Sequence, residues 1–269
     1  MKIDTLSVLV NFRGDGKVNS RLSSMSDTIL DEHYFCSSSE DVQKAIELLQ
    51  PSNKYVKISS NTDPLYKFAE KNCDKILEIM VAIKTMGFRV YLCTDDIEAV
   101  LENYSKKLAG LVDVYNIFLQ SGNTKNYASF LERMSSTPVL NRPIVNLSSV
   151  IMPYTSRHEM RDFAEDYYNV ITGNIEFCSY SVPSSWAIDA AHPHNSDVNH
   201  KYNRMVVDNI MNELETDKIE YVPVEPDYKQ AFLIDNTIVN GRFDQNGAAF
   251  LLGVTRSSIP DWLRPLVNR

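Results

Sequence analysis

Apolar residues recur along the chain in two patterns that alternate. Short runs rich in Val, Ile, Leu and aromatic residues predict strands buried on both faces, as in a parallel sheet. The expected strands are Leu6–Phe12, Glu32–Cys36, Tyr55–Ser59, Arg89–Cys93, Val112–Leu119, Ile144–Met152 and Ile175–Tyr180. Segments whose apolar residues recur every three or four positions predict helices. The expected helices are Glu40–Leu49, Phe68–Met86, Ile97–Leu108, Lys125–Met134, His158–Tyr168 and Tyr202–Leu214.

Residues that start and stop helices stand at the borders of these segments. Ser39 and Ser156 are expected to cap the helices that follow them, because a serine hydroxyl can accept a hydrogen bond from a free backbone N–H. Gly87 is expected to end a helix. Strands and helices that alternate with short links indicate parallel strands joined by right-handed crossovers. The fold class predicted is therefore α/β, a partial or full parallel βα barrel, with a doubly wound sheet as the alternative.

The alternation stops after Pro183, where a polar, irregular stretch precedes the last predicted helix. Two apolar runs follow, QAFLID and TIVNGRFDQNGAAFLLG. The pairs Asn240-Gly241 and Asn246-Gly247 are typical of hairpin turns. We therefore expect residues 1–183 to form a barrel-like domain and residues 184–269 to form a C-terminal β-rich extension, a helix plus a β-hairpin packed on the barrel.

Composition and charge exclude some classes of binding partner but say little about the reaction. The net charge is −8, which argues against broad binding to nucleic acid through a basic face. No apolar stretch reaches the roughly 20 residues that a membrane span needs, and the first residues lack the pattern of a signal peptide. A cytoplasmic protein without a membrane partner is expected, with its four cysteines reduced. The abundance of Asn, Ser, Asp, Lys and Tyr suggests a viral protein from an AT-rich phage genome.

Residues 61–94 carry a more specific pattern. A strand ends in Thr62-Asp63-Pro64, a long helix follows, and the next strand ends in Thr94. This arrangement resembles the middle of radical S-adenosylmethionine enzymes of the spore photoproduct lyase type. A later strand that closes in Pro153 and leads into an acidic helix is also similar, so that the resemblance spans residues 6–180. The resemblance implies a βα barrel that binds a nucleoside-containing ligand.

The cysteines that define that family are missing. Its enzymes hold a four-iron cluster with a CxxxCxxC loop after the first strand, because soft thiolates bind iron–sulfur clusters. When Arg13-Gly14 is matched to the family's lead-in, the ligand positions are Asp15, Asn19 and Leu22. An iron–sulfur cluster is therefore not expected. The hypothesis that follows is a barrel that binds or modifies a nucleotide or nucleic-acid component by non-radical chemistry.

The carboxyl ends of barrel strands are where active sites form, because the βα loops converge there. Four acidic residues at these ends are the candidates for catalysis: Asp15, Asp63, Asp95 and Asp96. Residues with hydrogen-bonding side chains at the same ends are the candidates for ligand binding: Arg13, Asn61, Thr62, Thr94, Asn123 and Tyr154. They suit a polar ligand such as a nucleotide.

Two alternatives use a divalent metal. Asp95 and Asp96 resemble part of the acidic motif of GT-A glycosyltransferases, in which carboxylates hold the cation that neutralises a sugar nucleotide. The same two residues would also serve as helix caps. Separately, His192, His194, Asp197 and His200 form the densest group of ligand-type side chains and could seat a transition metal. A non-catalytic interaction protein on a degenerate enzyme scaffold is the remaining alternative.

Overall fold

The computed structural model describes most of the barrel's strands and helices. The residues that it describes are 3–11, 35–59, 64–65, 73–94, 97–103, 107–119, 130, 132, 136, 142–151, 155–179, 197–222, 230–243 and 249–251. The strands are β1 (Thr5–Asn11), β2 (Phe35–Cys36), β3 (Tyr55–Ser59), β4 (Arg89–Thr94), β5 (Val114–Phe118), β6 (Ile144–Ile151), β7 (Ile175–Ser179), β8 (Ile219–Val222), β9 (Gln230–Ile234), β10 (Thr237–Phe243) and β11 (Ala249–Leu251). The helices are α2 (Ser39–Leu49), α3 (Cys73–Thr85), α4 (Ile97–Asn103), α6 (Arg157–Tyr167) and α7 (Asp197–Glu213). None of these helices is long and apolar enough to cross a membrane.

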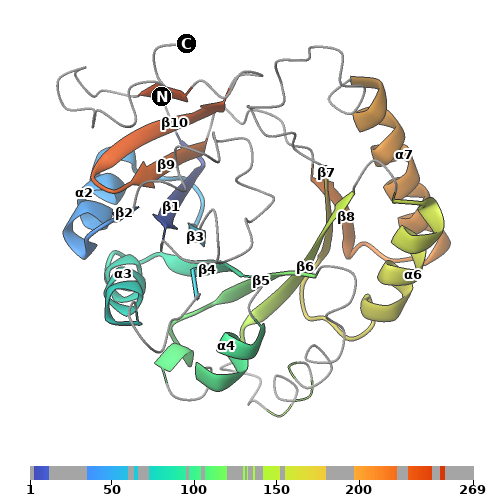
Figure 1. Ribbon diagram of the computed structural model, residues 1–269, viewed down its shortest axis with the longest axis horizontal. Helices are drawn as coiled ribbons and strands as arrows, with labels where there is room; N and C mark the ends of the chain where they lie inside the picture. Colours follow the sequence, from blue (N-terminus) through green and yellow to red (C-terminus); the bar gives the residue numbers. More distant parts are fainter. Residues whose placement is uncertain are drawn as a thin grey trace.

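Eight of the described strands are parallel and lie side by side in the order β9-β1-β3-β4-β5-β6-β7-β8. Figure 1 shows them along a curve with the helices on its outer side. A doubly wound sheet reverses its strand order at a switch point. Here the order follows the chain from β1 to β8, so the predicted βα barrel is confirmed and the doubly wound alternative is wrong.

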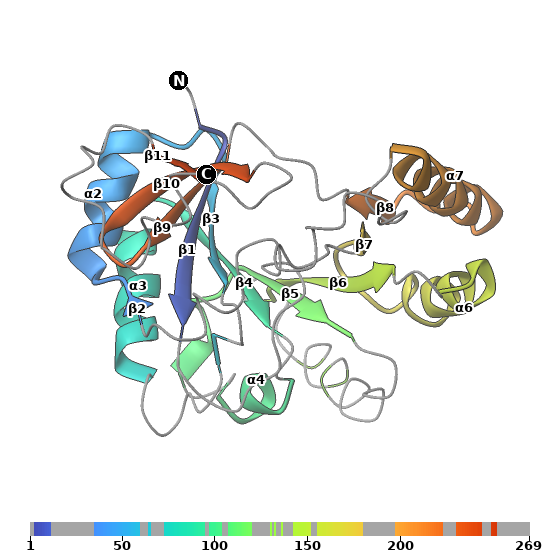
Figure 2. The ribbon, with the colours of Figure 1, turned by 45° about the horizontal axis from the view of Figure 1, so that its top comes forward.

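Over the described residues the barrel is partial, because its two end strands are not paired with each other. Within the described residues, β8 pairs with β7 and β9 pairs with β1, and no pairing joins β8 to β9. Residues 223–229 separate these two strands in the sequence. A parallel pair is normally joined by a crossover of a dozen residues or more. The short link explains why this seam differs from the others, and Figure 2 shows the curved sheet from a second side.

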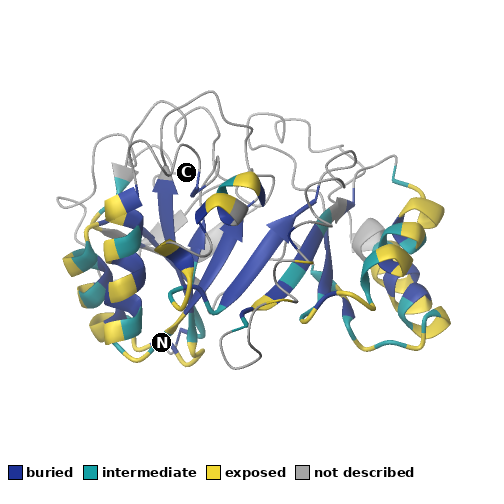
Figure 3. Cartoon of the chain, turned by 90° about the horizontal axis from the view of Figure 1, so that it is seen from below, coloured by how far each residue is buried: buried dark blue, intermediate teal, exposed yellow. Residues whose placement is uncertain are grey.

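The main core lies between the sheet and the helices. Alternate strand residues such as Val56, Ile58, Val90 and Leu92 face the helices and are fully buried there. The residues between them face the inside of the curve, where Tyr91, Cys93 and Val114 form a second, smaller cluster. Figure 3 shows the strands buried between helices whose outer surfaces are exposed. This alternation defines the inner face on which a site can be built.

Capping residues fix where two of the helices begin. Ser156 caps α6 as predicted, and Glu159 completes a capping box with it. Ser38, not Ser39, caps α2, since the Ser38 hydroxyl accepts from the Asp41 N–H at 3.1 Å. Ser39 is the first helical residue, so the prediction was wrong by one position. Gly87 follows α3 with φ 83°, which confirms its predicted role.

The C-terminal strands differ from the expectation in one turn. Ile234 pairs with Thr237, so the turn between β9 and β10 consists of Asp235 and Asn236. The predicted turn at Asn240-Gly241 is wrong, because both residues lie within β10, at an irregularity of its pairing with β11. Glycine in a strand commonly marks such a bulge. The pair Asn246-Gly247 lies outside the described residues, and the division into residues 1–183 and 184–269 stays a prediction.

Candidate functional site

Most of the predicted site residues lie outside the residues that the structure describes. These are Arg13, Asp15, Asn61, Thr62, Asp63, Asp95, Asp96, Asn123, Tyr154, His192 and His194. Thr94 is described and is the last residue of β4, where it is fully buried. Asp197 and His200 belong to the first turn of α7, of which only the backbone is described. The predicted catalytic set is therefore untested.

The metal hypotheses stay predictions for the same reason. The described part of the chain contains no group of three or more His, Cys, Asp and Glu side chains that could hold a metal ion. His158 is the one histidine whose side chain is described, and it is exposed. Its Nε2 lies 3.6 Å from Asp162 Oδ2 in the next turn of α6. This contact on the helix surface does not indicate a metal ligand. The glycosyltransferase alternative depends on Asp95 and Asp96 and is likewise untested.

Polar side chains that the sequence reasoning missed meet on the inner face of the barrel. We call this group the inner-wall network, and it consists of Tyr91 on β4, Asn116 on β5, Asn146 and Ser148 on β6, and Glu176 on β7. Each of these residues lies on its strand between two residues that face the helices. The sequence signal that could have indicated them is a polar residue inside an otherwise apolar strand.

Glu176 is the centre of the inner-wall network. Glu176 is 6% exposed, and a buried carboxylate is costly unless hydrogen bonds replace the lost water. Tyr91 Oη donates to Glu176 Oε1 at 3.0 Å, and Asn146 Nδ2 donates to the same oxygen at 3.3 Å. Ser148 Oγ donates to Glu176 Oε2 at 3.0 Å. The sheet thus supplies donors from two other strands to one carboxylate.

Ser148 extends the network toward β5. Its Oγ also lies 2.7 Å from Asn116 Oδ1, and Asn116 Nδ2 points to Cys93 Sγ at 3.8 Å. A hydroxyl has one proton and donates to one acceptor at a time. Ser148 can therefore direct its proton to Glu176 or to Asn116, so the network can rearrange without moving a strand. A phenol and a carboxylate in contact, as at Tyr91 and Glu176, are groups that can exchange protons with a ligand.

Asn146 is held from the amino end of β7. Its Oδ1 accepts the backbone N–H of Asn174 at 3.0 Å, which turns its amide nitrogen toward Tyr91 and Glu176. Gly173 packs directly against this side chain, and a Cβ at that position would overlap it. Loop residues before β7 therefore set the orientation of a side chain on β6.

Cations and aromatic rings stand beside the network on β3 and β4. Lys57 Nζ lies 5.0 Å from the centre of the Tyr91 ring, and Tyr55 contacts that ring edge to face. Arg89 donates to Tyr55 Oη at 3.4 Å, and this bond raises the pKa of its guanidinium above the usual value. The inner face thus carries positive charge on one side and the Glu176 carboxylate on the other.

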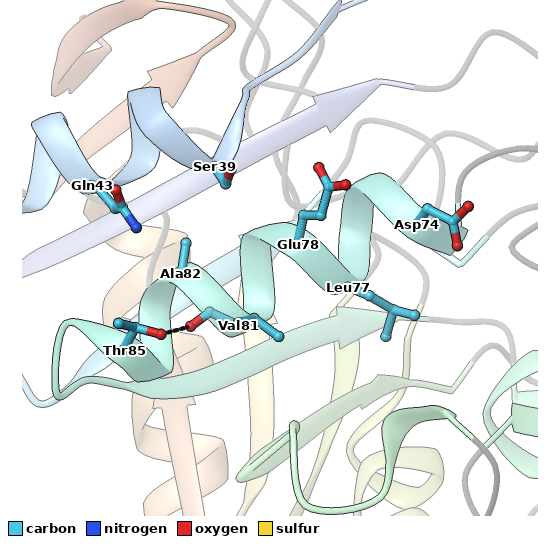
Figure 4. Close-up of a pocket in the computed structure, with 8 residues that line it drawn as sticks. All are labelled: Ser39, Gln43, Asp74, Leu77, Glu78, Val81, Ala82 and Thr85. Atoms are coloured by element: carbon cyan, nitrogen blue, oxygen red, sulfur yellow. Dashed lines mark hydrogen bonds between the residues drawn. The ribbon is translucent and has the colours of Figure 1, made fainter.

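A shallow groove also lies between α2 and α3 on the outer surface, as Figure 4 shows. It is lined by Ser39, Gln43, Asp74, Leu77, Glu78, Val81, Ala82 and Thr85. Helix-surface side chains form it, and Thr85 Oγ1 is already bonded to the Val81 carbonyl at 2.8 Å. It contains none of the predicted catalytic, ligand-binding or metal-binding residues, and the inner face remains the candidate site.

Comparison with known proteins supports the fold alone. No protein-family model and no curated protein sequence matches the chain. The structure of SuiB from Streptococcus suis bound to S-adenosylmethionine is similar, with a TM-score of 0.54 at 10% identity over 83% of this chain. The match covers 48% of SuiB, so this chain spans about half the length of that protein. The 3-dehydroquinate dehydratase from Aquifex aeolicus VF5 matches at a TM-score of 0.41 and 13% identity, over 84% of this chain and 92% of that one. The likeness to SuiB agrees, at the level of fold, with the expected barrel.

Proposed function

We propose that the barrel binds or modifies a nucleotide-like ligand on its inner face by non-radical chemistry. The observation that carries the proposal is the inner-wall network centred on Glu176. Polar groups inside a protein cost free energy, and their gathering on the inner face of a barrel, whose active site forms at the carboxyl ends of the same strands, favours a role in binding a ligand. A barrel filled only for stability would favour branched apolar side chains at these positions.

The chemistry of the network suits a nucleoside. An amide such as that of Asn146, which is only partly buried, presents a donor and an acceptor together, and this is the pattern along the edge of a nucleobase. A carboxylate accepts from ribose hydroxyls or from an exocyclic amine. SuiB has a similar fold and was crystallised with S-adenosylmethionine, a nucleoside derivative, which favours this ligand class for the proposal.

Calorimetric titration tests the proposal with adenosine, AMP, ATP and S-adenosylmethionine as probes. We expect at least one probe to bind stoichiometrically and to raise the melting temperature. Glu176→Gln should weaken that binding about tenfold or more, since a hydrogen bond to a charged group contributes about 1.5–3 kcal/mol. Ser148→Ala should also weaken it, because it removes the bond from Ser148 Oγ that holds the Glu176 carboxylate in place. Glu165→Gln, on the exposed side of α6, is the matched control and should leave binding unchanged.

Two results would contradict the proposal. If none of the probes binds, the non-catalytic interaction protein becomes the better reading. If a probe binds and neither inner-face variant weakens it, the ligand lies elsewhere. The absence of a cluster remains part of the proposal, because Asp15, Asn19 and Leu22 stand where thiolates are required. Anaerobic reconstitution with iron and sulfide should leave the visible absorption spectrum flat.

A further inference from the structure

The side chain of Lys57, on β3, lies on the inner face of the barrel. Lys57 is the middle residue of β3, and its neighbours Val56 and Ile58 face the helices in the main core. Its own side chain therefore faces inward, where it stands opposite Tyr91 in the register of β3 and β4. The side chain is partly buried, with Nζ over the Tyr91 ring at 5.0 Å. A lysine in this position loses part of its hydration.

The Lys57 ammonium makes a cation–π contact with the Tyr91 ring. A ring face attracts an ammonium but does not replace a carboxylate as the partner of its N–H groups, and among the described side chains no carboxylate pairs with Lys57. Lys84, by contrast, reaches both oxygens of Asp113 at 2.9 Å. The chain has 35 acidic residues and a net charge of −8, so carboxylates to pair with Lys57 are plentiful in the sequence. The Lys57 ammonium on the inner face is therefore suited to bind an anionic ligand.

Charge is separated across the inner face. Lys57 lies on one side of Tyr91, and Tyr91 Oη donates to Glu176 Oε1 at 3.0 Å on the other. The cation and the carboxylate therefore both contact one tyrosine and are held apart by it. A second pair of charges is arranged in the same way nearer the amino ends of the strands, with the positive charge of Arg89 on β4 and the negative charge of Glu220 on β8. A ligand that fits this face carries donors at one end and an anionic group at the other.

We infer that Lys57 binds the anionic group of the ligand, a phosphate or carboxylate oxygen, while the inner-wall network binds its hydrogen-bonding part. This inference rests on the proposed function and specifies the ligand class as a nucleoside with a negatively charged substituent. Tyr91 positions the lysine through its ring and the carboxylate through its hydroxyl.

Calorimetric titrations of the full chain with adenosine, AMP and S-adenosylmethionine separate the possible sources of the anion. A charge-assisted contact should make the wild type bind a charged probe about tenfold or more tightly than adenosine. A preference for AMP identifies a phosphate, and a preference for S-adenosylmethionine identifies its carboxylate. Lys57→Gln should bring the charged probe down to the affinity of adenosine and leave adenosine itself unchanged. Lys57→Arg should keep most of the preference, and Lys44→Gln on the exposed face of α2 should keep all of it.

The salt dependence gives a second readout that a purely structural role would not produce. In the wild type, the affinity for the charged probe should fall as the ionic strength rises. In Lys57→Gln, the affinity should no longer depend on ionic strength. Equal affinities for adenosine and both charged probes, or an undiminished preference in Lys57→Gln, overturn this inference while leaving the proposed function intact. Failure of all probes to bind the wild type overturns both.

Discussion

The position of Gly173, next to the inner-wall network, has no room for a side chain. A Cβ there would overlap the Asn146 side chain and lie 2.9 Å from the Val145 carbonyl oxygen. We expect Gly173→Ala to lower the free energy of unfolding by about 1–3 kcal/mol, since overpacking forces neighbours out of place. Urea denaturation followed by circular dichroism measures this change.

A double variant separates the contact from general damage near β7. Because Asn146→Ala removes the overlapped side chain, Gly173→Ala with Asn146→Ala should cost less than the sum of the single variants, by about 0.5 kcal/mol or more. Strict additivity would show that the overlap with the Asn146 side chain does not cause the loss of stability in Gly173→Ala. Gly87→Ala, at a position with φ 83° and open space around it, gives the cost of backbone strain without a clash.

Cys36 provides a prediction about pH. Burial raises the pKa of its thiol to about 11, with Asp235 and Glu78 adding to the rise and Lys75 opposing it. Only the thiolate is alkylated, so native protein should react slowly with iodoacetamide at pH 8, and the rate should rise until the pH passes about 11. The raised pKa also means that Cys36 favours folding while it is protonated and loses this contribution as the pH rises from about 8.5 toward the native value.

Mass spectrometry of the alkylated peptide measures the rate at each pH. The same protein in urea is the control, because there the thiol should titrate near its ordinary value of about 8.5. A native profile with a midpoint near that ordinary value would contradict the burial of Cys36. Cys36→Ser removes the labelled site and checks its assignment.

At the scale of single residues, the sequence predicted little of the candidate site. Asn116, Asn146 and Glu176 each look like an isolated polar residue in an apolar strand, and nothing local says that they meet. Their contact depends on the register of β5, β6 and β7, which pairs Asn116 with Asn146 and Ser148 with Glu176. Register arises from packing of the whole sheet and is not written in any one segment.

Among the elements, α2 offers a test of which serine starts the helix. Ser38 Oγ accepts the Asp41 N–H, and the Asp41 carboxylate accepts the Ser38 N–H in return. We expect Ser38→Ala to destabilise the protein by about 1 kcal/mol, the usual effect of losing an N-cap. Ser39→Ala is the matched control and should change stability by less than about 0.5 kcal/mol. Equal losses, measured by urea denaturation, would contradict the assignment of Ser38 as the cap.

Elements were more predictable than the site because their signals are local. The strands predicted at Tyr55–Ser59 and Ile175–Tyr180 are observed as β3 and β7, which ends at Ser179. Their helix-facing residues, such as Val56, Ile58 and Phe177, are apolar, and this local signal predicts a buried strand even where the inward residues are polar. The turn at Asn240-Gly241 failed because the same dipeptide is compatible with a bulge. The choice depends on the pairing of β10 with β9 and β11, which a local pattern does not contain.

At the scale of the whole molecule, β9 is expected to be part of the cooperative core. It pairs with β1, and Leu233 is 1% exposed within the main cluster. Leu233→Ala should lower the free energy of unfolding by about 2–4 kcal/mol, from lost burial and the cavity left behind. Leu48→Ala, at a leucine that is 72% exposed, should change it by less than about 0.5 kcal/mol.

Scanning calorimetry then tests the predicted division at residue 183. Because β8 and β9 belong to the same sheet as β1 to β7, we expect one unfolding transition that moves as a whole in Leu233→Ala. A separate transition that alone shifts would instead favour an independent unit formed by residues 184–269. The measurement therefore decides between one cooperative body and a barrel with an attached extension.

The pairing of β1 with β9 sets the order in which a nascent chain can complete its sheet. As the ribosome releases the chain, each strand from β3 to β8 finds its neighbour already synthesised. The other edge of β1 has to wait for β9, since its parallel partners include Thr5 with Gln230. Closing so long a loop costs entropy and slows folding, and an unpaired edge exposed meanwhile can join other chains. We therefore expect β1, which is synthesised before the other strands of this sheet, to be the last one enclosed. Its edge is then the place where a chaperone would be most useful during synthesis.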